Sequence, residues 1–114
     1  MEKMRVIVVD DETIIRLDIK EMLVEAGHIV IAEAAEGEEA VRLATELKPD
    51  LVIMDVKMRG MDGITAARLI NENQIAPVLL LTAYSQADLV EKAKESGVLA
   101  YLVKPIREEQ LFPA

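Results

Sequence analysis

The sequence of 114 residues contains no cysteine and no tryptophan, and only 3% of its residues are aromatic. Without cysteine the chain cannot form a disulfide framework or a thiolate metal site. It also has no run of about eighteen apolar residues, the length that a membrane-spanning helix needs, and no signal-peptide pattern. We therefore expect a cytoplasmic protein with no membrane association.

Positive charge is scarce as well. The chain has 13 Lys and Arg residues against 21 Asp and Glu residues, which gives a formal net charge of −8. Nucleic-acid backbones attract clustered basic side chains, so we expect no direct binding of nucleic acid. The single histidine, His28, has no potential ligand or base partner near it in the sequence, and we interpret it as structural or exposed.

The hydrophobic residues, 52% of the chain, are enough to fill one core, and the length suits a single domain over residues 1–114. Short apolar runs alternate with amphipathic, helix-like stretches. The runs are almost continuously hydrophobic, which is typical of parallel strands covered on both faces. This alternation predicts an open α/β fold with a parallel sheet and helices on both of its faces. The five predicted strands are residues 4–9, 29–34, 51–54, 78–81 and 100–103.

Capping residues mark several helix ends in this pattern. Gly27 and Gly97 stand where helix C-terminal caps are expected. Asp62 and Ser85 stand at N-cap positions. A fifth helix would begin near Arg107, but only eight residues remain from there. We therefore predict a truncated fifth helix and expect the parent protein to be longer.

Polar side chains stand at the ends of four of the five predicted strands. In an open parallel sheet, ligands bind beyond the carboxyl ends of the strands. Asp10 and Asp11 follow the first strand, and Asp55 follows the third. Thr82 ends the fourth strand and Lys104 follows the fifth. If the first and third strands are neighbours, the three carboxylates converge.

These residue types indicate phosphoryl chemistry. Three clustered carboxylates repel one another and need a cation. Oxygen ligands without His or Cys favour Mg²⁺, and Lys104 adds a second positive charge. A metal ion and an ammonium group beside one carboxylate stabilise a phosphoryl group during its transfer. The pattern therefore predicts that Asp55 attacks a phosphoryl donor to give an acyl phosphate, which water later removes.

Five motifs occur in an order and spacing that resemble those of bacterial two-component response-regulator receiver domains of the CheY-like type. The resemblance covers nearly the whole chain and implies a flavodoxin-like five-stranded sheet of order 2-1-3-4-5. It also implies a phosphoacceptor that is not a turnover enzyme and that serves a sensor histidine kinase. The motifs are Val-Val-Asp-Asp-Glu at 8–12, Leu-Val-Ile-Met-Asp-Val-Lys-Met at 51–58, Met-Asp-Gly at 61–63, Leu-Thr-Ala at 81–83 and Lys-Pro at 104–105.

The same resemblance implies a role for each site residue. Asp55 would be the phosphoacceptor, contacted after transfer by Thr82 and Lys104. Thr82 and Tyr101 would form the switch that responds to the phosphoryl group. The implied Mg²⁺ ligands are Asp10, Asp11, Asp55 and the backbone carbonyl of Lys57.

Two further features concern the loop after Asp55 and the end of the chain. Receivers usually have proline where this sequence has Arg59, so we expect a looser loop there. Residues 107–114 are similar to those of receivers joined to the RNA-binding ANTAR output domain of transcription antiterminators. That similarity implies the chain's own output domain as a partner, and a homodimer is a further option.

Three other functions compete with this one. Phosphatases of the haloacid-dehalogenase type need a second Asp two residues after the nucleophile, where this chain has Lys57. A flavin or nucleotide carrier needs an anion-binding loop after the first strand, where this chain has acidic residues. A degenerate receiver, acting as an unphosphorylated interaction module, stays open as the alternative.

Overall fold

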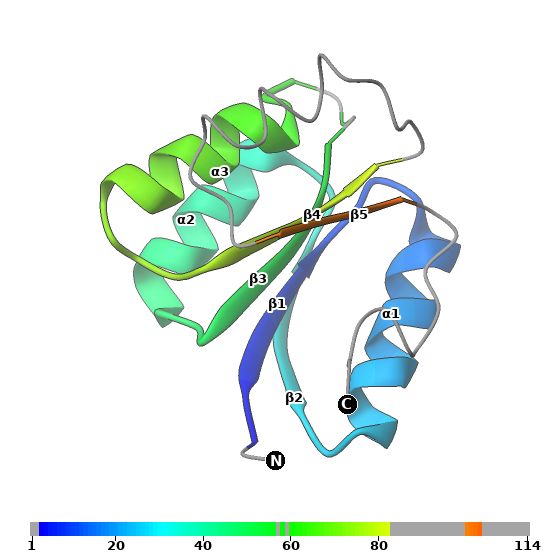
Figure 1. Ribbon diagram of the computed structural model, residues 1–114. Helices are drawn as coiled ribbons and strands as arrows, with labels where there is room; N and C mark the ends of the chain where they lie inside the picture. Colours follow the sequence, from blue (N-terminus) through cyan, green and yellow to red (C-terminus); the bar gives the residue numbers. More distant parts are fainter. Residues whose placement is uncertain (1–2, 57, 59, 83–99, 104–114) are drawn as a thin grey trace.

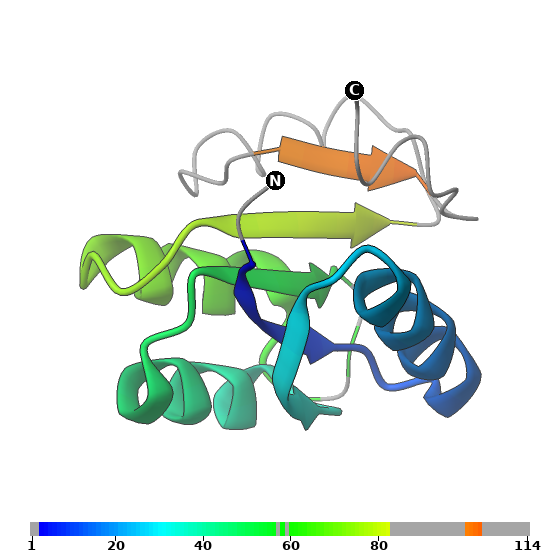
Figure 2. The same cartoon turned by 90° about the horizontal axis from the view of Figure 1, so that it is seen from below.

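The structure is a computed structural model that describes residues 3–56, 58, 60–82 and 100–103, the last four by their backbone alone. Its centre is a five-stranded parallel sheet of order β2-β1-β3-β4-β5 (Figures 1 and 2). This is the predicted strand order. The strands are β1 (Arg5–Val9), β2 (Ile29–Ala34), β3 (Leu51–Asp55), β4 (Val78–Thr82) and β5 (Ala100–Val103).

Helices cover both faces of the sheet, as predicted. Helix α1 (Thr13–Glu25) lies on one face, and α2 (Gly37–Leu47) and α3 (Gly63–Glu72) lie side by side on the other (Figure 1). The fourth and fifth helices predicted from the sequence lie outside the described residues. Among the described helices, none is long and apolar enough to cross a membrane.

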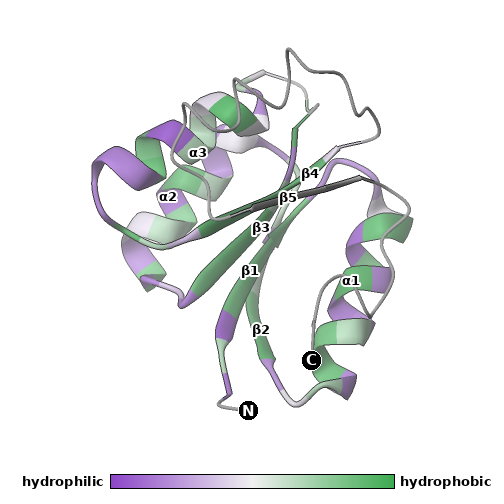
Figure 3. Cartoon of the chain, in the orientation of Figure 1, coloured by the Kyte–Doolittle hydropathy of each residue, from purple (hydrophilic) through white to green (hydrophobic). Residues whose placement is uncertain are grey.

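The sheet divides the hydrophobic core into two clusters. One lies beneath α2 and α3 and includes Ile7, Met54 and Leu80, and the other lies beneath α1 and includes Val8 and Ile53. Neighbouring residues of β1 and β3 point to opposite faces, and both faces are covered, so the strands are apolar over residues 6–9 and 51–54 (Figure 3). The sequence therefore shows continuous runs there rather than alternation.

Local capping interactions fix the helix ends that the sequence indicated. Gly27, at φ +91°, follows the C-cap of α1 in the left-handed region. Its N–H bonds to Val24 O at 3.0 Å and the N–H of His28 bonds to Leu23 O at 2.9 Å, the pair that defines a Schellman motif. Asp62 is the N-cap of α3 and accepts a hydrogen bond of 2.8 Å from Thr65 N. Ser85 and Gly97 lie outside the described residues.

The strand boundaries differ by one residue at three places. β1 begins at Arg5 rather than at residue 4, whereas β3 and β4 each extend one residue further than predicted. The ladder explains the extensions, because Asp55 pairs with Leu81 and Thr82 pairs with Val103. Asp55 and Thr82, which the sequence placed at the ends of apolar runs, are thus part of the sheet.

His28 is structural, one of the two outcomes expected for it. It is buried, with 4% of its surface exposed, and lies between α1 and β2. Its Nδ1 accepts a hydrogen bond of 3.0 Å from Met4 N. This bond ties the segment before β1 to the start of β2.

Candidate functional site

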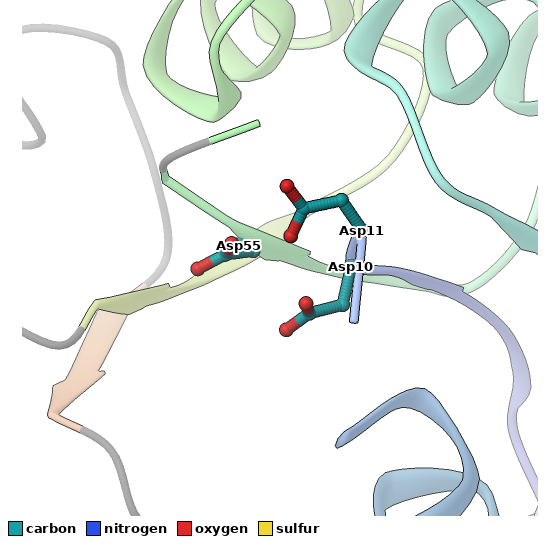
Figure 4. A group of neighbouring side chains, drawn as sticks. All are labelled: Asp10, Asp11 and Asp55. Carbon is teal, nitrogen blue, oxygen red and sulfur yellow. The ribbon is translucent and has the colours of Figure 1, made fainter. Parts of the chain in front are cut away.

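Three carboxylates meet at the carboxyl ends of the two central strands. Asp10 directly follows β1 and Asp55 is the last residue of β3, and these strands pair in parallel with Val9 opposite Met54. That register places Asp10 beside Asp55. One carboxylate oxygen from each of Asp10, Asp11 and Asp55 lies within 4.8 Å of the others (Figure 4). The convergence expected from adjacent first and third strands is therefore present.

The three carboxylates differ in their exposure. Asp10 is fully buried and Asp55 is 4% exposed, whereas Asp11 is exposed to solvent. In Figure 4 the carboxyl groups of Asp10 and Asp11 lie on either side of Asp55. The site therefore has a buried floor of two carboxylates and an open side formed by the third.

Backbone and side-chain hydrogen bonds hold the loop that carries Asp10 and Asp11. The N–H of Asp10 bonds to Ala34 O of β2 at 3.0 Å. Its Oδ1 accepts a bond of 2.9 Å from Glu12 N. Its carbonyl oxygen accepts a bond of 2.7 Å from Nη1 of Arg16. Asp10 is thus fixed through its backbone as well as through its carboxyl group.

The donor chemistry of this group fits a magnesium ion. Mg²⁺ binds oxygen ligands at about 2.0–2.1 Å, so two ligands of one ion are at most about 4.2 Å apart. A spread of up to 4.8 Å between the oxygens is close to that limit. Small side-chain rotations, or one ligand acting through water, would meet it. In the described part of the chain this is the one group of three or more acidic, His or Cys residues close enough to share an ion.

Thr82 lies beside this group on the next strand. It is the last residue of β4, 5% exposed, and directly follows Leu81, the ladder partner of Asp55. Tyr101 pairs with Leu80 through the β4–β5 ladder, and of Tyr101 only the backbone is described. Lys57, Arg59 and Lys104 lie outside the described residues, so their predicted roles stay predictions.

Sequence reasoning missed two residues that contact the site. One is Arg16, described above. The other is Gly63, whose N–H bonds to Val56 O at 2.8 Å. A Cβ atom added at Gly63 would lie 2.0 Å from the carbonyl oxygen of Asp55, a distance that no real pair of atoms tolerates. Gly63 stands in the Met-Asp-Gly motif, but nothing in that motif indicates which atom it approaches.

Comparison with known proteins identifies the family. The model of the response regulator receiver domain matches residues 6–114 of this chain. The chain belongs to the response regulator receiver family. Receivers are phosphoacceptor domains that work with histidine kinases and output domains, so the phosphatase and flavin-carrier interpretations are set aside.

Curated relatives agree with this assignment. The transcriptional regulatory protein PdtaR of Mycobacterium tuberculosis is 54% identical over 110 residues, which cover 96% of this receiver and 54% of PdtaR. The chemotaxis protein CheY of Bacillus subtilis is 38% identical over 111 residues, which cover 96% of this receiver and 92% of CheY. The chain therefore spans about half the length of PdtaR and nearly all of CheY.

Solved structures share the fold. The signal receiver domain of NarL from Mycobacterium tuberculosis superimposes with a TM-score of 0.92 at 30% identity, covering 97% of this receiver and 91% of that chain. A chain from the crystal structure of the CheX-CheY-BeF3-Mg²⁺ complex of Borrelia burgdorferi gives a TM-score of 0.85 at 28% identity, covering 94% of this receiver and 82% of that chain. The flavodoxin-like fold predicted from the resemblance is confirmed.

Proposed function

We propose that this receiver takes a phosphoryl group onto Asp55 from the phosphohistidine of a sensor histidine kinase. The observation that supports this proposal is the position of Asp55. Its carboxyl group ends a central strand and lies within 4.8 Å of two further carboxylates. A lone buried carboxylate would repel the negatively charged phosphoryl donor, whereas a carboxylate in a group that binds a cation would have that repulsion offset by the ion.

The residues that would hold Mg²⁺ are Asp10, Asp11, Asp55 and the backbone carbonyl of Lys57. When bound, the ion neutralises the negative charge that gathers on the oxygens of the phosphoryl group during transfer. Asp10, held through its backbone, provides a fixed ligand on the floor of the site. Asp11 provides an exposed ligand on the open side.

The step itself is a displacement at phosphorus. An oxygen of Asp55 forms a bond to phosphorus as the bond from phosphorus to the kinase histidine nitrogen breaks, and the electron pair of that bond returns to the imidazole. The product is an acyl phosphate on Asp55, which water later cleaves to a carboxylate and inorganic phosphate. The chain would carry a phosphoryl group and release it, rather than turn over a separate substrate.

The response to phosphorylation would pass through the fourth and fifth strands. The hydroxyl group of Thr82 would donate a hydrogen bond to one phosphoryl oxygen, and the ammonium group of Lys104 would form an ion pair with another. Tyr101 would turn inward as Thr82 moves toward the phosphoryl group, which is the switch predicted from the family resemblance. The added charge, about −1.5 to −2 by analogy with other phosphorylated side chains, supplies the free energy that shifts the population between two surface states.

The partners of the domain are also proposals. A receiver needs a kinase and an output, and PdtaR, named as a transcriptional regulatory protein, is about twice as long as the matched segment. We propose that the domain over residues 1–114 acts in the cytoplasm and controls an output domain of its own protein, with the RNA-binding ANTAR class as the first candidate. A homodimer stays a prediction.

Intact mass spectrometry tests the phosphoacceptor directly. The protein is incubated with acetyl phosphate, with and without Mg²⁺, beside Asp55→Asn and beside Asp18→Asn, an exposed carboxylate on α1. We expect one phosphoryl adduct in the wild type and in Asp18→Asn, dependent on Mg²⁺, and none in Asp55→Asn. An adduct that persists in Asp55→Asn would refute the assignment. If the wild type forms no adduct and binds no beryllofluoride, the domain is the unphosphorylated interaction module.

A further inference from the structure

Arg16 joins the acidic site to the edge of the sheet. It lies in the first turn of α1, and its side chain is 19% exposed. Nη1 donates a hydrogen bond of 2.7 Å to the carbonyl oxygen of Asp10, and Nε lies 3.4 Å from Oε1 of Glu33 on β2. One guanidinium group therefore contacts the loop after β1 and a strand that is a neighbour of β1.

The carbonyl that Arg16 contacts has a special place in the chain. It belongs to the peptide group that joins Asp10 to Asp11, which are two of the three clustered carboxylates. Because the peptide group is planar, the direction of one side chain relative to the other depends on ψ of Asp10 and φ of Asp11, the two rotations on either side of it. A contact that holds the carbonyl restrains both angles. The bond from Arg16 is short, and bonds from charged donors are among the strongest in proteins.

Glu33 fixes the orientation of the guanidinium group in turn. Its two oxygens face two cations of α1, Arg16 at 3.4 Å and Lys20 at 3.5 Å. Glu33 pairs with Val8 in the ladder between β1 and β2, so its backbone is held by the sheet. The planar fork of arginine can reach a carboxylate and a carbonyl together, which a lysine ammonium group does with less geometric control.

We propose that Arg16 is a positioning residue for the metal site. It holds the peptide between Asp10 and Asp11 so that the two carboxylates keep the spacing that Mg²⁺ requires. This inference rests on the proposed function, because it assumes that the carboxylates bind Mg²⁺. Partners that orient metal ligands typically contribute about tenfold to a hundredfold in metal affinity.

Charge alone predicts the opposite result, and this separates the two explanations. If Arg16 acted only through its charge, it would repel Mg²⁺, and removing its side chain would strengthen Mg²⁺ binding. If Arg16 instead positions the two carboxylates, removing its side chain would weaken Mg²⁺ binding. The sign of the change in affinity on removing the side chain therefore distinguishes them.

The experiment is a calorimetric titration of the unphosphorylated protein with Mg²⁺. Arg16→Met, Arg16→Lys and the control Arg42→Met are compared with the wild type. Arg42 pairs with Glu39 and Glu46 on the outer surface of α2 and is 58% exposed, so its removal changes the net charge equally but leaves the acidic loop intact. Melting without Mg²⁺ shows that each variant is folded.

We expect Arg16→Met to raise the dissociation constant for Mg²⁺ about tenfold, Arg16→Lys to raise it by a smaller factor, and Arg42→Met to leave it unchanged or slightly lower. Unchanged or tighter binding in Arg16→Met would overturn the proposal. If Arg16→Met does not fold, Arg16→Lys decides, since it keeps the charge, and wild-type affinity there would overturn the proposal. Failure of the wild type itself to bind Mg²⁺ would instead sink the proposed function.

Discussion

Replacing Gly63 by alanine tests how tightly the start of α3 is packed against Asp55, the proposed phosphoacceptor. The added Cβ atom would lie 2.0 Å from Asp55 O, 2.8 Å from Asp55 C and 2.9 Å from Val56 Cα. All three atoms are backbone, so no side-chain rotation relieves the overlap. The strand end and the helix would have to separate by more than about 1 Å to reach ordinary contact distances.

The expected cost follows from that displacement. Overpacking a core usually costs about 1–3 kcal/mol, and we expect the upper end, about 3 kcal/mol, because both sides are backbone. For a domain of this size that corresponds to a fall in melting temperature of about 12 °C. A misplacement of about 1 Å at a reacting group can cost about a hundredfold in rate, so Mg²⁺-dependent labelling by acetyl phosphate should slow by that order at temperatures where the variant is folded.

A second glycine provides the control for this variant. Gly27 has φ +91° and nothing within 4 Å of an added Cβ, so Gly27→Ala adds strain without overlap. We expect it to cost about 1 kcal/mol and to be labelled at the wild-type rate. The measurements are differential scanning calorimetry and the initial rate of adduct formation. A Gly63→Ala protein that melts like the wild type and is labelled equally fast would refute the reasoning.

Two further predictions concern stability. Asp62→Ala removes the N-cap hydrogen bond from Thr65 N and should lower the free energy of unfolding, measured by urea denaturation, by about 1 kcal/mol. Asp62→Asn keeps an acceptor oxygen and should lower it much less. Equal losses in the two variants would contradict the capping role. Mg²⁺ at about 100 times its dissociation constant should raise the free energy of unfolding by about 2.7 kcal/mol. Asp11→Asn removes one of three carboxylates that repel one another, so without metal it should melt at the wild-type temperature or above it. It should nevertheless lose most of the increase that Mg²⁺ gives, and a full increase in this variant would remove Asp11 from the ligands.

The sequence predicted the sheet well because its physical signals are local. Continuous apolar runs in β1, β3 and β4 follow from burial on both faces, and the polar residues at their ends, acidic after β1 and in β3 and a threonine in β4, stand out against them. The order of the strands came from the family resemblance, since no local signal says which strands are neighbours. Once that order is known, the meeting of Asp10 with Asp55 follows from the register of β1 and β3.

The contacts around the site were not predictable in the same way. Arg16 reads as one more charge on an amphipathic helix, and its bond to Asp10 O depends on the angle at which α1 packs on the sheet. Gly63 reads as part of a turn, although its missing side chain leaves room for Asp55 O. Both contacts join residues through backbone atoms, whose positions the side-chain pattern of a sequence does not encode.

The unequal burial of the three carboxylates has a consequence for how quickly the site can be filled and emptied. Asp10 and Asp55 are buried, but Asp11 faces solvent. If Asp11 is a ligand, as proposed, a metal ion would meet it while still largely hydrated, before reaching the two buried carboxylates. The occupancy of the site should then follow the concentration of free Mg²⁺ without delay. The fraction of molecules that can accept a phosphoryl group would depend on that concentration and not on the rate of a conformational change.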